Sequence, residues 1–169
     1  MKSTTRSILV DPISNTITEI EIPRDKVDFI HEVIGCERCS QVYFGNKMNL
    51  SVDDVGLINI PREPLPPFNV RQGFFVIHAD GQARNLIAGK GILWAYDHEG
   101  ITVDLPPWIT PAFIAKFIKF VPLDQRNAAA GLCREIMAGG ESEGIVIHLG
   151  APRKRYIEIV KRALGLCRI

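Results

Sequence analysis

The feature that most constrains the fold is a glycine-framed turn, followed by the most apolar strand-type segment in its half of the chain. Both lie within Leu86–Gly100, where Gly89 and Gly91 flank Lys90 and Ile92–Tyr96 follow. A short apolar run bounded by turn residues is typical of a buried strand. The two glycines predict a tight turn or bulge where only glycine avoids a steric penalty.

Two other regions predict β-hairpins. In the first, residues 7–10 are followed by turn-forming residues 11–15 and by 16–22, where isoleucines alternate with polar residues. In the second, residues 41–44 and 48–52 flank the turn Gly45-Asn46. Residues 74–78, 86–87 and 144–149 predict additional strands.

Helices are predicted at fewer places. Pro23 is suited to the first turn of a helix. One side of this predicted helix carries Val27, Ile30, Val33 and Ile34, and the helix is expected to end at Gly35. Thr110-Pro111 predicts an N-cap and first helical residue, after which 112–121 is either one helix or a short helix followed by a strand at 118–121. Two more helices are expected over 128–137 and 156–164.

These elements predict an α+β fold, mostly an antiparallel sheet built from hairpins, with three or four packed helices. A length of 169 residues suits one well-buried core and is short for two ordinary domains. We expect a single domain over 1–169, with 122–169 as a C-terminal β-α extension.

The composition of the chain limits where the protein can be located and which partners it can bind. Hydrophobic residues make up 46% of the chain and charged residues 23%, as in an ordinary soluble globular protein. The N-terminal apolar run is too short for a signal peptide, and no segment approaches the length of a membrane span. We therefore expect a cytoplasmic protein without membrane contact, whose four cysteines stay reduced. No cofactor is predicted, and the oligomeric state is open.

A Cys-x-x-Cys pair is the sharpest metal candidate. Cys36 and Cys39 can present two thiolates to one zinc ion, and His31 is close enough in sequence to join them. A complete site needs a fourth ligand, and the other cysteines, Cys133 and Cys167, stand alone. We favour the alternative in which Cys36 packs below a helix end as a small hydrophobic residue, and we predict no metal.

Lys90, between its two glycines, has some features of a phosphate-binding loop. However, the full spacing of that motif is absent and a strand follows in place of a helix. The favoured interpretation is a structural turn, with Lys90 at its tip in reach of a ligand.

Histidines offer candidates for acid–base chemistry. His98 lies between Asp97 and Glu99 at a strand end, and His148 lies on a predicted strand. A solvated turn and a core histidine are the favoured interpretations. Asp53, Asp54 and His78 have equally ordinary interpretations as turn acids and a strand histidine.

The best binding-site candidate from sequence is the basic start of the last predicted helix. Gly150 ends a predicted strand, and Arg153, Lys154 and Arg155 follow. Free N–H groups at a helix N-terminus together with arginines favour an anion, whereas three basic residues there oppose the helix dipole unless an anionic partner is present. The sequence predicts anion or partner binding by Gly150, Arg153, Lys154, Arg155 and Lys90.

Five short motifs, in a fairly specific order, carry a resemblance to a known family: Ser7–Pro12, Ile20–Ile22, Ile34–Cys36, Val52–Leu57 and Ala88–Gly91. Over about residues 7–121 the chain resembles a family of small uncharacterised proteins, defined only as a domain of unknown function and common in phages, plasmids and other mobile elements. The resemblance brings no catalytic residues. It implies an accessory protein of a mobile element that binds a host factor, a nucleotide signal or a defence complex.

Two functional classes remain. The preferred prediction is a non-enzymatic accessory binding protein of phage or mobile-element origin, acting on a host protein, a nucleotide or a nucleic acid. The alternative is a small hydrolase or transferase acting on a nucleotide or phosphodiester through His148 or His98 with nearby acids.

Overall fold

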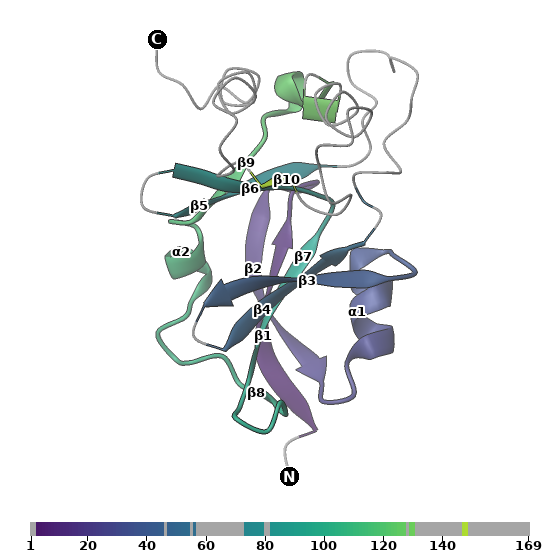
Figure 1. Cartoon of the computed structure of the whole chain (residues 1–169), viewed down its shortest axis with the longest axis vertical. Coiled ribbons are helices and arrows are strands. Elements are labelled where there is room, and N and C mark those ends of the chain that lie inside the picture. Colours follow the sequence, from purple (N-terminus) through teal and green to yellow (C-terminus); the bar gives the residue numbers. More distant parts are fainter. Residues whose placement is uncertain are drawn as a thin grey trace.

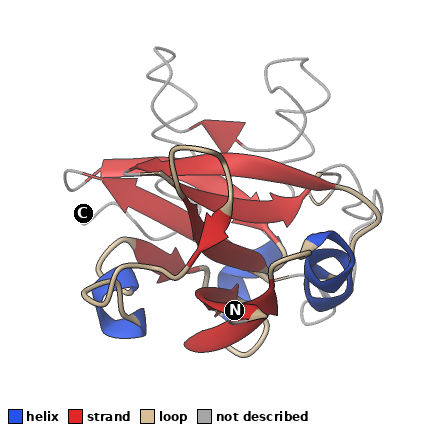
Figure 2. Cartoon of the chain, turned by 90° about the horizontal axis from the view of Figure 1, so that it is seen from below, coloured by secondary structure: helices blue, strands red, loops and turns tan. Residues whose placement is uncertain are grey.

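The computed structural model describes residues 3–45, 47–54, 56, 73–79, 82–127, 129–130 and 147–148. Antiparallel strands form the body of the molecule, and short helices lie at its edges (Figure 2). The strands are β1 (Thr4–Asp11), β2 (Thr16–Pro23), β3 (Cys39–Gly45), β4 (Met48–Asp53), β5 (Phe74–Ala79), β6 (Gln82–Ala88), β7 (Gly91–Tyr96), β8 (Thr102–Val103), β9 (Ile118–Phe120) and β10 (Ile147–His148). The helices are α1 (Val27–Ile34), α2 (Pro111–Ile114) and the 3-10 turn η1 (Leu123–Gln125).

The strands form two antiparallel sheets. Sheet A has the order β2-β1-β7-β4-β3, with β8 paired to the end of β7. Sheet B has the order β10-β6-β5-β9. Figure 1 shows sheet B lying across one end of sheet A, with α1 and α2 on opposite sides of the molecule. Both predicted hairpins are present, as β1–β2 and β3–β4.

The glycine-framed stretch is the corner at which the chain passes from sheet B to sheet A. Gly89 has a φ of 82° and donates its N–H to the carbonyl of Gly73 at 2.8 Å, so it supplies the turn. Gly91 serves a different purpose, because a Cβ there would lie 3.0 Å from Leu50 Cδ1 and 3.3 Å from Phe75 Cζ. The second glycine is therefore required by the close approach of the two sheets.

The main core lies between the sheets. Sheet A contributes Ile8, Val10, Leu50 and Leu93, and sheet B contributes Phe75, Ile77 and Ile87, all of them buried. A second, smaller cluster on the other face of sheet A joins Ile22, Ile92 and Trp94 to Ile30 of α1. Sheet A is thus buried on both faces, which explains why β7 is apolar at nearly every position.

The predicted α+β class with three or four packed helices is wrong. Within the described residues there are two helices, of which one has seven or more residues. The segment 112–121 takes the second of its two alternatives, a four-residue helix followed by β9, because pairing with β5 supplies an edge strand to sheet B. The helix predicted over 156–164 lies outside the described residues, as does most of the one predicted over 128–137.

The start of α1 also differs from the prediction. Pro23 ends β2, and the helix begins at Val27, whose side chain is 58% exposed and does not join the apolar face. Its end is as predicted: Gly35 is left-handed, with a φ of 80°, and donates its N–H to the carbonyl of His31.

Candidate functional site

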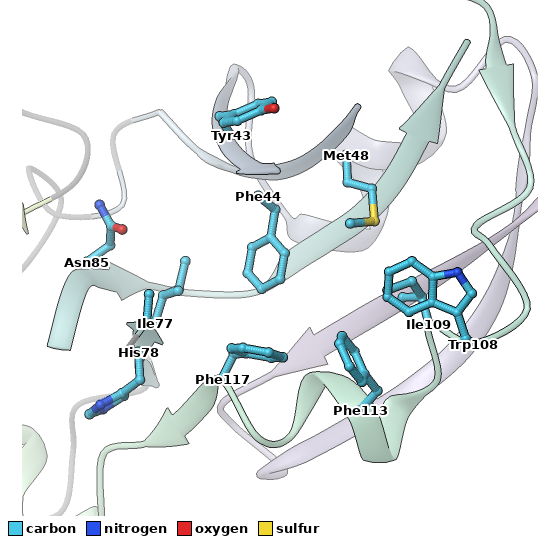
Figure 3. Close-up of a pocket in the computed structure, with 11 residues that line it drawn as sticks. Tyr43, Phe44, Met48, Ile77, His78, Asn85, Trp108, Ile109, Phe113 and Phe117 are labelled. Atoms are coloured by element: carbon cyan, nitrogen blue, oxygen red, sulfur yellow. The ribbon is translucent and has the colours of Figure 1, made fainter. Parts of the chain in front are cut away.

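A pocket of 350 Å³ opens beside the main core, where both sheets and α2 meet. Two of its walls come from the β3–β4 hairpin and from β5 and β6, and the third comes from residues 108–117 (Figure 3). Its lining residues are Tyr43, Phe44, Met48, Ile77, His78, Ala79, Asn85, Trp108, Ile109, Phe113 and Phe117. Aromatic and aliphatic side chains dominate this lining, and none of the described residues in it is a carboxylate, a lysine or an arginine.

Four aromatic rings form a connected chain along the pocket. Trp108 meets Phe113 edge to face at 5.4 Å between centroids, Phe113 lies 5.2 Å from Phe117, and Phe117 meets Phe44 edge to face at 6.3 Å. Figure 3 shows Phe44 and Met48 pointing from the hairpin toward Phe113 and Phe117 on the opposite wall. Rings separated by about 4.5–7 Å attract one another through their quadrupoles, so the wall is internally supported.

Arg6 holds the loop that carries Trp108. Its guanidinium donates to the carbonyl oxygens of Leu105 at 3.1 Å, Pro106 at 3.2 Å and Ile109 at 2.7 Å. Its Nε lies 2.8 Å from Glu19 Oε2. A planar fork with five donors suits several carbonyl groups at once, so one side chain fixes the path of 105–109.

Helix α2 places Phe113 and Phe117. Thr110 is the N-cap, its hydroxyl oxygen accepting from the N–H of Phe113 at 3.2 Å, and Pro111 follows as the first helical residue, as the sequence predicts. Phe117 lies in the turn that follows α2, where its N–H donates to the carbonyl of Ile114 at 2.9 Å, and its ring is 5.2 Å from that of Phe113.

The polar groups of the pocket lie at its margin. His78 stands at a bulge of β5, and Figure 3 shows its imidazole turned away from the aromatic rings. Its Nε2 is buried without a hydrogen-bond partner in the described part of the chain. Burial, and secondarily the charge of Lys119, hold the pKa of His78 below its usual value, which favours the neutral ring.

Tyr43 and Asn85 complete that margin. Tyr43 is 68% exposed and lies on the far side of β3 from Phe44 (Figure 3). Asn85 is partly buried on β6 and already has an interaction partner.

Of the residues predicted from sequence to bind an anion, the structure describes only Lys90, which does not line this pocket. Lys90 Nζ lies 3.9 Å from Asp11 Oδ2, with 30% of its side chain exposed, at the corner between the sheets. Gly150, Arg153, Lys154 and Arg155 lie outside the described residues, so their role stays a prediction.

The metal candidates and the turn that contains His98 are likewise separate from the pocket. Cys36 and Cys39 approach one another at the end of α1, but across the described residues no group of three or more His, Cys, Asp or Glu side chains could hold a metal ion, so His31 does not join them. His98 Nε2 lies 3.7 Å from Glu99 Oε1 in an exposed turn. Of His148, the structure gives only the pairing of its backbone with Asn85.

Asp97 caps the same turn as His98. Its Oδ1 accepts the N–H groups of Glu99 and Ile101, both at 2.9 Å, and these hydrogen bonds hold the pKa of Asp97 below its usual value. The favoured interpretation of Asp97-His98-Glu99 as a solvated turn therefore fits the geometry.

Sequence reasoning missed the pocket. The available signals were Trp108 beside two prolines, where an aromatic ring is hard to bury, and two phenylalanines four residues apart. Neither reveals that Phe44 and Met48, at least 60 residues earlier in the chain, form the opposite wall.

Comparisons of the chain with protein-family models, with curated proteins and with solved structures find no match. The resemblance to a family of mobile-element proteins therefore stays a prediction. Among the described helices, none is both long and apolar enough to cross a bilayer.

Proposed function

We propose that this protein is a non-enzymatic binding protein whose pocket takes a small apolar molecule that carries an aromatic ring. The observation that carries the proposal is the 350 Å³ pocket with its connected aromatic wall. An accessory role in a phage or mobile element belongs to the same proposal and rests on the sequence resemblance alone.

The size and chemistry of the pocket support this choice. Small-molecule sites typically enclose about 300–1,000 Å³ and are lined mainly by apolar and aromatic side chains with a few polar groups. This pocket lies at the small end of that range, which suits one or two fused rings. Phe44, Phe113 and Phe117 offer faces and edges to a ligand ring at spacings that aromatic pairs prefer.

Trp108 is the residue best placed to report binding. Its indole is 54% exposed, although it contacts Phe113 and lines the pocket. Exposing a large aromatic side chain to water is unfavourable, and a bound ligand ring that covers the side chain removes this cost. Ligand binding is thus expected to bury Trp108.

The hydrolase or transferase alternative gains no support from the described residues. His98 and Asp97 belong to an exposed turn, and the imidazole of His78, at the pocket margin, is turned away from the aromatic rings. General acid–base catalysis requires the group to lie within hydrogen-bond reach of a bound substrate. We therefore do not propose a catalytic function.

A fluorescence titration with N-phenyl-1-naphthylamine tests the proposal, because this uncharged probe carries aromatic rings and no anionic group. We expect one saturable site, with affinity weakened roughly 2- to 12-fold in Trp108→Ala, the loss that corresponds to an aromatic contact of about 0.5–1.5 kcal/mol. Phe113→Leu should weaken binding similarly, and Trp108→Phe should weaken it less.

Leu123→Ala is the matched control, because Leu123 is 52% exposed and lies outside the pocket. Near-UV circular dichroism of each variant shows whether its core packing is intact. Non-saturable binding, or equal affinity in Trp108→Ala and Leu123→Ala, would contradict the proposal.

A further inference from the structure

Two cysteine thiols meet at the junction of α1 and β3. Cys36 directly follows the left-handed Gly35 that ends the helix, and its N–H donates to the carbonyl of His31 at 3.0 Å. Cys39 is the first residue of β3. The two Sγ atoms lie 3.1 Å apart, which is close for two unbonded sulfurs and about 1 Å more than a disulfide bond.

The local backbone explains why the sulfurs converge. Gly35 reverses the chain after α1, and the pairing of Cys39 with Asp53 fixes the start of β3 in sheet A. Only two residues separate the cysteines, and both ends of this link are held by backbone hydrogen bonds. Closure to a covalent bond shortens the distance between the two sulfurs by about 1 Å.

The described surroundings of the pair leave both thiols accessible. Both cysteines are partly exposed and free. Within the described ranges no third histidine, cysteine or carboxylate joins them in a group that could hold a metal ion. Two adjacent, accessible thiols can be oxidised to a disulfide.

We propose that Cys36 and Cys39 form an oxidation site at which a low-molecular-weight disulfide converts the two thiols into an intramolecular disulfide. One cysteine attacks the reagent disulfide as its thiolate, forming a mixed disulfide and releasing one reagent thiol. The second cysteine, after losing its proton to solvent, attacks the protein sulfur of that mixed disulfide and releases the second reagent thiol. Two protein thiols are thereby oxidised and one reagent disulfide is reduced to two thiols.

The environment also makes this reaction slow. Burial raises the pKa of both thiols, for Cys39 to about 12, and the carboxylates of Asp53 and Asp54 contribute in the same direction. A thiol with a raised pKa is mostly protonated near neutral pH and is a poor nucleophile in that form. The reactive thiolate is therefore scarce near neutral pH, and the site differs from a fast redox catalyst in its rate.

The test uses the full chain with Cys133→Ser and Cys167→Ser, so that only the proposed pair can react. After incubation with oxidised glutathione under native conditions, we expect a loss of two hydrogens in the intact mass and no titratable thiol. Trypsin cleaves after Arg38, between the two cysteines, so the resulting peptides stay joined until a reductant is added.

Single variants provide the matched controls. Adding Cys36→Ser or Cys39→Ser to this background should leave a stable glutathione adduct on the remaining cysteine, because no neighbour can displace it. If glutathione instead stayed attached in the protein that keeps both Cys36 and Cys39, the proposal would be overturned. Reaction that occurs only after unfolding in urea would overturn it as well, since the folded geometry would then not support closure.

Discussion

His78 illustrates how a single side chain couples the pocket margin to stability. Burial lowers the pKa of this partly buried ring and so favours its neutral form, while in the unfolded chain a histidine takes up a proton below about pH 6.5. The unfolded state therefore binds more protons than the folded state as the pH falls through this region. Stability contributed by the neutral ring is present above that pH and is lost below it.

We accordingly predict that the free energy of unfolding decreases as the pH falls from about 7.5 to about 5, by no more than about 1.4 kcal/mol per pH unit for this one proton. His78→Gln should flatten the dependence in urea unfolding measured across this range. His98→Gln, at a side chain that is 80% exposed, should leave it as in the original protein. An unchanged slope in His78→Gln would show that other groups cause the dependence.

Gly91 shows the limit of residue-level prediction. The sequence indicates a position where a side chain is not tolerated, and a tight turn is the natural interpretation of a glycine next to a strand. The reason found in the structure is the approach of Leu50 from sheet A and Phe75 from sheet B. Only the meeting of two sheets creates that contact, so the residue type alone could not reveal it.

At the scale of elements, the loop 104–109 and α2 act as one wall of the pocket because Arg6 of β1 holds them. The main chain of Arg6 adds to the side-chain hydrogen bonds: its N–H donates to Asp104 Oδ1 at 2.7 Å, and its carbonyl accepts from Leu105 at 3.1 Å. The pocket wall is thus attached to a strand that lies nearly 100 residues earlier in the chain.

We predict that Arg6→Lys destabilises the protein by about 2 kcal/mol, because lysine keeps the charge but cannot reach three carbonyl groups, and hydrogen bonds to charged groups contribute about 1.5–3 kcal/mol. Probe affinity at the pocket should fall with it, as Trp108 loses its fixed position. Urea unfolding and the fluorescence titration measure the two effects. The control is Arg24→Lys, at an exposed arginine beside the same sheet. If both variants had equal effects, Arg6 would not be the residue that holds the loop 104–109.

The elements also differ in how well the local sequence predicts them. The cap at Thr110-Pro111 was predictable because it depends on residues next to one another. The residues after it were ambiguous, since Ala112–Val121 has helical and strand features, and pairing of β9 with β5 decided between them. Sheet pairing overrode local preference there.

At the scale of the whole molecule, β7 is the centre of sheet A. It pairs with β1 on one side and β4 on the other, whereas β2 and β3 are at the ends of the strand order. Exposing the amide hydrogens of β7 to solvent requires that β7 separate from β1 and β4 and that the cores on both faces of sheet A be disrupted.

We predict that the amide hydrogens of Ile92 and Leu93 exchange with solvent at a rate set by global unfolding. Amides at the outer edge of β2 should exchange roughly tenfold faster or more, through local opening. Hydrogen-exchange mass spectrometry or NMR under native conditions measures both sets. Equal protection in β2 and β7 would indicate a partner on the outer edge of β2.

The sequence by itself determined the hairpins β1–β2 and β3–β4, the end of α1 at Gly35 and the N-cap at Thr110, because each depends on residues a few positions apart. Tertiary structure alone decided the order of strands, the need for glycine at position 91 and the use of 118–120 as a strand. It also decided the pocket, since Phe44, Ile77, Trp108 and Phe117 meet only when two sheets and a loop pack together. The physical reason is that contacts between distant segments depend on how the whole core packs and which surfaces it buries. Local sequence patterns do not contain that information.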